Sequence, residues 1–184
     1  MKNRLVYILF NNATESDYIC FEQITSVLTD KRIKVLSELV SVEYKQSIRG
    51  FLRAMAQDGK IIMIISDSFL KSTKCMQVAT GILDKVDFYD RIFPIVMPEA
   101  NVLNPVGMIT YFNYWDNKIN ELNQKMKQLS ALNHMEAINT EINLYVKIRS
   151  YTGNFMQILN QMFYIQYDDV KQKNFDVLIR KLLN

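Results

Sequence analysis

Polar side chains that could do chemistry follow an apolar run in the middle of the chain. Residues 60–65 (KIIMII) are apolar and mostly β-branched, and they are followed directly by Ser66 and Asp67. A second apolar run spans residues 91–97, and residues 69–85 between the two runs have helical spacing. Two buried strands joined by a helix form a parallel unit, and open parallel sheets bind ligands at the carboxyl ends of their strands. The sequence therefore predicts a site at Ser66, Asp67 and the beginning of the helix.

Other kinds of site find little support in the sequence. The five glycines do not cluster, so a dinucleotide fingerprint and a P-loop are both missing. The single histidine, His134, lacks the paired spacing of a zinc site. A phospho-receiver domain needs an acidic cluster after its first strand to hold Mg²⁺, and here that place is taken by Asn11 and Asn12. We expect no metal and an inert, buried Cys75 rather than a cysteine nucleophile.

Composition and charge limit the classes of protein to which the chain can belong. The chain has 184 residues, of which 49% are hydrophobic and 22% charged, and its net charge is +3. These values suit one globular domain with an appendage. The basic residues are spread along the chain, and no apolar run reaches the length of a membrane span, so we expect neither nucleic acid nor membrane as a partner. Two cysteines without a disulfide framework favour a reduced, cytoplasmic protein.

The order of the predicted elements indicates an α/β domain. Thr14 and Asp17 form a helix start, with a capping hydroxyl and an acid three residues later, and this helix continues to about residue 29. Another helix begins after Ser47. Runs of apolar and β-forming residues predict five strands that alternate with helices in a parallel sheet, at residues 4–10, 33–36, 60–65, 91–97 and 109–115.

The chain changes character after residue 116. Apolar residues then recur every three or four positions, which predicts a helical tail of roughly 65 residues, including an amphipathic helix at 175–182. Burial of these apolar faces in a core is the simplest interpretation. The aromatic segment 162–167 (MFYIQY) is alternatively an interface patch.

Three stretches together resemble bacterial Toll/interleukin-1 receptor (TIR) domains: ISDSFLKSTKCM at 65–76, RIFPIV at 91–96 and YFNYWDNKINEL at 111–122. Residues 34–48 resemble the second strand and the BB loop of the same family. The resemblance implies a flavodoxin-like α/β fold with a five-stranded parallel sheet of order 2-1-3-4-5. It also implies a TIR domain at residues 1–130 and a helical extension at 131–184 packed on it.

Many members of this family work in immunity or anti-phage defence, some as scaffolds that assemble and others as enzymes that cleave NAD⁺. The enzymes use a glutamate three residues after the cysteine that corresponds to Cys75. Here that position is Val78, which can neither carry charge nor form a hydrogen bond, so the resemblance implies a pseudoenzyme. The family's BB-loop glycine corresponds to Lys45, and the serine-rich end of its first strand corresponds to residues 9–12.

The resemblance assigns roles to two groups of residues. The nucleotide pocket of the family corresponds to Phe10, Asn11, Ser66, Cys75 and Val78. The assembly surface of the BB loop corresponds to Tyr44, Lys45, Gln46 and Ser47.

We favour a non-catalytic TIR domain that acts by assembly with other TIR domains or with itself and requires no cofactor. One alternative is an NAD⁺ glycohydrolase or cyclase with a different carboxylate. Asp67 is the best candidate for that carboxylate, ahead of Glu38, Glu43 and Asp84. Another alternative is a sensor that binds NAD⁺ or a cyclic nucleotide without cleaving it.

Overall fold

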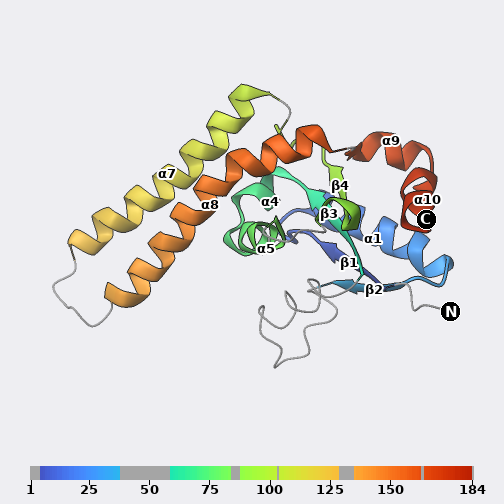
Figure 1. Ribbon diagram of the computed structural model, residues 1–184, viewed down its shortest axis with the longest axis horizontal. Coiled ribbons are helices and arrows are strands. Elements are labelled where there is room, and N and C mark those ends of the chain that lie inside the picture. Colours follow the sequence, from blue (N-terminus) through green and yellow to red (C-terminus); the bar gives the residue numbers. More distant parts are fainter. Residues whose placement is uncertain are drawn as a thin grey trace. The chain divides into compact units, whose positions relative to one another are not determined.

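The computed structural model describes residues 5–37, 59–83, 88–102, 104–128, 135–162 and 164–183. Its centre is one sheet of five parallel strands in the order β2-β1-β3-β4-β5 (Figure 1). The strands are β1 (Leu5–Leu9), β2 (Lys34–Ser37), β3 (Lys60–Ile65), β4 (Ile92–Val96) and β5 (Ile165–Gln166). The predicted α/β fold and its strand order are therefore confirmed.

The two faces of the sheet follow from the alternation of side chains along each strand. Val6 and Ile8 of β1, like Ile62 and Ile64 of β3, belong to one apolar core. The same core includes side chains of three helices, α1 (Glu15–Asp30), α9 (Tyr167–Gln172) and α10 (Asp176–Leu183). Figure 1 shows α5 (Thr73–Leu83) on the opposite side of the sheet from α1 and α10. The strands are thus covered on both faces, as their continuous apolar sequences predict.

The first helix begins as its sequence predicts. Thr14 has an extended backbone, and its side chain accepts a hydrogen bond from the backbone N–H of Asp17. Asp17, Cys20, Ile24 and Leu28 are buried, which places an acid on the apolar face of α1. At the other end, Arg32 adopts a left-handed backbone with φ of 58° as the chain turns into β2.

The segment after β3 differs from its prediction. The single helix expected at 69–85 is two helices, α4 (Asp67–Lys71) and α5. Ser72 separates them because its backbone is extended, with φ of −85° and ψ of 118°. Its hydroxyl accepts a hydrogen bond from the N–H of Cys75 and so helps to begin the second helix. A short helix, α6 (Phe88–Arg91), then leads into β4.

The expected fifth strand at 109–115 is wrong, because these residues lie in the helix α7 (Pro105–Lys127). Asn104 caps this helix, and Pro105 occupies its first turn. Tyr111 and Trp115 are both buried and stand four residues apart, which is a helical spacing. A helix start and a helical period therefore outweigh the β propensity of the aromatic and β-branched residues.

The fifth strand lies instead inside the predicted helical tail. Ile165 and Gln166 pair in parallel with Ile95 and Val96 of β4. This strand falls within segment 162–167, for which an interface patch was the alternative interpretation. Most of the described tail is helical as predicted, with α8 (Met135–Gln161) before β5 and α9 and α10 after it.

The chain divides into two compact units, residues 1–100 with 162–184 and residues 101–161. The first unit holds the sheet. The second is a hairpin of α7 and α8, in which Trp115 lies against Tyr145 with ring centroids 5.6 Å apart and Arg149 pairs with Asp116 at 2.7 Å. The hairpin is inserted between β4 and β5 in the sequence. The expected boundary between residues 130 and 131 lies outside the described residues, so packing of an extension on a TIR domain stays a prediction.

None of the helices within the described ranges is both long enough and apolar enough to cross a membrane.

Candidate functional site

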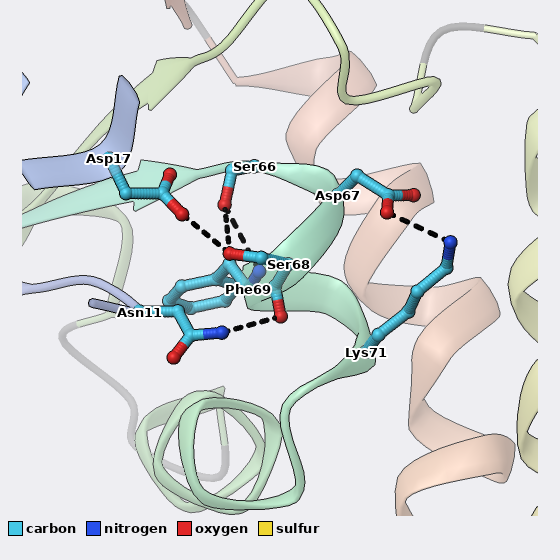
Figure 2. A network of polar contacts seen from close by, with 7 residues as sticks. All are labelled: Asn11, Asp17, Ser66, Asp67, Ser68, Phe69 and Lys71. Carbon is cyan, nitrogen blue, oxygen red and sulfur yellow. Dashed lines mark hydrogen bonds and ion pairs between the residues drawn. The ribbon is translucent and has the colours of Figure 1, made fainter. Parts of the chain in front are cut away.

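The candidate site lies where β1 and β3 end side by side. Leu9 of β1 is paired with Met63 of β3, so Asn11 and Ser66 leave the same edge of the sheet. Ser66 caps α4, because its hydroxyl accepts a hydrogen bond of 3.0 Å from the backbone N–H of Phe69. Figure 2 shows how Asn11, Asp17, Ser66 and Ser68 meet at this edge. Two of them, Asn11 and Ser66, were predicted from the sequence to bind a nucleotide.

Ser68 joins the three other residues of this network. Its hydroxyl donates to Asp17 Oδ2 at 2.5 Å, and its backbone carbonyl accepts from Asn11 Nδ2 at 3.0 Å. Its hydroxyl also lies 3.0 Å from that of Ser66. Because the Ser68 proton points to the carboxylate, the Ser66 hydroxyl must donate to Ser68. The hydrogen bonds therefore run in one direction, from the N–H of Phe69 to the carboxylate of Asp17.

Asp17 is the residue that reasoning from the sequence missed. It was taken only as an acid near a helix start, yet its side chain is fully buried. Oδ2 accepts a second hydrogen bond of 2.7 Å from the Thr14 hydroxyl, whereas Oδ1 has no hydrogen-bond partner among the described residues. The signal was the spacing of Asp17 from Cys20 and Ile24, which puts it on the buried face of the helix.

Asp67 does not join the network. Its carboxylate pairs with Lys71 at 2.8 Å, four residues later on α4, and 38% of its side-chain surface is exposed. Figure 2 shows this pair apart from the other polar contacts. An exposed ion pair at this spacing contributes only about 0.3–0.5 kcal/mol to stability.

The other predicted pocket residues are buried in the core. Cys75 Sγ lies 3.6 Å from the carbonyl oxygen of Phe10, and the Phe10 ring stacks on Phe21 with centroids 4.3 Å apart. Val78 has no exposed surface. The structure thus brings Phe10 and Cys75 together at the end of β1, but their role toward a nucleotide stays a prediction.

Several predicted residues lie outside the described part of the chain. They are the assembly residues Tyr44, Lys45, Gln46 and Ser47 and the alternative carboxylates Glu38, Glu43 and Asp84.

The electrostatics of this region leave one thiol inert. Burial raises the pKa of Cys20 to about 12, and the negative charges of Asp17 and Glu99 add to the rise while Lys171 opposes it. The thiolate is the reactive form of cysteine, so Cys20 is no nucleophile at neutral pH. In the described ranges, no three His, Cys, Asp or Glu side chains lie close enough together to hold a metal ion.

Comparison with solved structures identifies the fold. The model is similar to a chain described as "Structure of the activated Roq1 resistosome directly recognizing the pathogen effector XopQ (TIR domains)", with a TM-score of 0.63. The match covers 97% of this chain and 99% of that chain. The protein has the fold of a TIR domain. Sequence identity over the match is 12%, so the TIR fold is shared without a transfer of residue roles.

Sequence comparisons add nothing to this TIR fold. No model of a protein family matches the chain, and no curated protein matches it.

Proposed function

We propose that this protein is a non-catalytic TIR domain that works in signalling or defence by assembling with other TIR domains or with copies of itself. The observation that carries the proposal is how the side chains at the carboxyl edge of the sheet are bonded and buried. The hydroxyls of Ser66 and Ser68 and the carboxylate of Asp17 bond to one another, and Val78 is fully buried. These polar groups form a network that holds α1 and α4 to the sheet.

Two described positions near this edge support the same conclusion. Cleavage of a glycosidic bond with an oxocarbenium-like transition state needs a carboxylate that reaches the sugar. Val78 stands where the family resemblance places that group, and Asp17 is buried and accepts hydrogen bonds from the hydroxyls of Thr14 and Ser68. Loss of one stabilising group at a transition state typically lowers a rate a hundred- to thousandfold.

Assembly is supported by the fold. The similar chain comes from a complex described as a resistosome, whose TIR domains are named in its description. We place the assembly surface of this protein at residues 44–47, from the sequence resemblance to the BB loop.

The test combines turnover with mass measurement. The purified protein at high concentration should release no nicotinamide from NAD⁺ by chromatography. Light scattering during size-exclusion chromatography should show a mass that rises with protein concentration. Lys45→Glu should lower that mass, whereas Lys127→Glu on an exposed position of α7 should not. Nicotinamide release would overturn the catalytic half of the proposal, and a monomer at every concentration that binds no other TIR protein would overturn the other half.

A second candidate, an NAD⁺ hydrolase that uses Asp67, is favoured by one observation. This carboxylate directly follows β3, and 38% of its side-chain surface is exposed, so a substrate can reach it. If the natural protein does release nicotinamide, Asp67→Asn should abolish the release, and unchanged turnover in that variant would exclude this residue. Binding of NAD⁺ without cleavage would appear as a thermal shift with the nucleotide and would indicate a sensor.

A further inference from the structure

Among the described residues, no strand pairs with the amino-terminal half of β4 on its outer side. β5 pairs only with Ile95 and Val96, so Ile92, Phe93 and Pro94 form an open stretch of the sheet edge. Pro94 is compatible with this open edge, because the nitrogen of a proline has no proton to donate to a neighbouring strand. A hollow of about 220 Å³ lies against this stretch. It is lined by Asp90, Ile92, Phe93, Pro94, Met162, Ile165 and Lys181.

The size of the hollow limits what it can hold. Pockets for drug-sized ligands are about 300–1,000 Å³, so a hollow of 220 Å³ is too small for a nucleotide. Five of its lining side chains are apolar, and one of these is the aromatic ring of Phe93. A single ring or a branched alkyl group fits this space and this chemistry.

Two ammonium groups stand at the hollow. Lys181 lines it directly. Lys60 Nζ lies 5.4 Å from the centre of the Phe93 ring and donates a hydrogen bond of 3.0 Å to the backbone carbonyl of Lys181. Asp90 is the single acid among the lining residues that the structure describes. The rim therefore carries more positive than negative charge, which favours an anionic head group on a ligand with an apolar body.

We propose that this hollow is a binding site for a small carboxylate whose body is one aromatic ring or branched alkyl group. The body packs against Phe93, Met162 and Ile165 at the open edge of β4. The carboxylate meets the ammonium groups of Lys60 and Lys181. This site is at the amino end of the sheet, opposite the Ser66 network, and it does not depend on the function proposed above.

Titration of the full-length protein with phenylacetate, followed by amide chemical shifts, tests the site. We expect saturable shifts of residues around the hollow with a dissociation constant of about 1 mM, because a ligand this small has few contacts. Phenethylamine has the same ring with the opposite charge, and it should bind at least tenfold more weakly. Equal binding of the two compounds, or no saturable shift at these residues, would overturn the proposal.

Variants separate the role of charge from that of shape. Lys181→Met keeps the aliphatic stem and should weaken phenylacetate binding about fivefold. Lys181→Glu should abolish this binding and improve that of phenethylamine. Lys173→Met at an exposed position of the same unit is the matched control and should bind as the natural protein does. If Lys181→Glu proves unstable, Lys60→Met serves as a second charge test. Phenylacetate binding that survives in a folded Lys181→Glu or Lys60→Met variant refutes the assignment.

Discussion

The two ends of the sheet are built in opposite ways. At the carboxyl end, the side chains of Asn11, Asp17, Ser66 and Ser68 are joined by hydrogen bonds around a buried carboxylate (Figure 2). At the amino end, no described strand pairs with the outer side of residues 92–94 of β4, and an apolar hollow with lysines at its rim lies beside them. Hydrogen bonds between the polar side chains hold α1 and α4 to the first end, whereas the second end has an apolar hollow with space for a ligand. We therefore interpret the carboxyl end as a part that stabilises the fold and the amino end as the proposed binding site.

The largest effect is expected from a charge placed at Val78. This side chain is fully buried on α5, so Val78→Glu should lower the free energy of unfolding by about 4 kcal/mol in urea titrations. The neighbouring Gln77 is exposed, and Gln77→Glu adds the same charge to the same helix with a change of about 0.5 kcal/mol or less. Equal stability of the two variants would show that residue 78 faces an accessible pocket. NAD⁺ turnover of Val78→Glu would then be the next measurement.

A smaller loss is expected at the centre of the polar network. Asp17→Ala leaves the hydroxyls of Thr14 and Ser68 without their acceptor, and hydrogen bonds to a charged group contribute about 1.5–3 kcal/mol each. Removal of the carboxylate also relieves the burial of Oδ1, so we expect a net loss of about 2–3 kcal/mol in the free energy of unfolding. Glu15→Ala, at an exposed acid in the same helical turn, is the control. A network that serves structure predicts a large difference between these two variants.

The smallest effect is expected at the cap of α4. Ser66→Ala removes the acceptor of the Phe69 N–H and one donor to Ser68, and loss of a helix cap lowers stability by about 1 kcal/mol. Thermal unfolding is sensitive enough to measure this change against Ser26→Ala, at an exposed serine of α1. A change near zero would mean that water replaces the cap, and hence that the carboxyl end is more open than the network indicates.

Much of the fold could be predicted because its signals are local. The run at 60–65 has the bounds of β3, and Thr14 and Asp17 mark the beginning of α1. The fifth strand could not be found in this way. With only Ile165 and Gln166 it is too short for a pattern, and its pairing with β4 is a contact between residues far apart in the sequence. The aromatic run at 109–115 was more conspicuous, and its helical spacing decided the outcome.

The candidate site was predicted in part. The position of Ser66 after a buried strand follows from the residue pattern, whereas its nearness to Asn11 was implied only by the family resemblance. The role of Asp17 needed the structure, because its spacing from Cys20 and Ile24 indicates the buried face of the helix but not that the Ser68 hydroxyl, 51 residues later, meets its carboxylate. The hollow at β4 was also invisible, since Lys60, Phe93 and Lys181 meet only through long-range folding.

The late position of β5 in the chain has a consequence for synthesis on the ribosome. β4 ends at Val96, and its partner β5 begins only at Ile165, after the whole helical hairpin. While residues 97–164 are being translated, the entire outer edge of β4 stays uncovered, and exposed strand edges recruit other chains. A nascent chain that stalls within the hairpin therefore presents a four-stranded sheet with an open edge, and chaperone binding should be greatest in that interval.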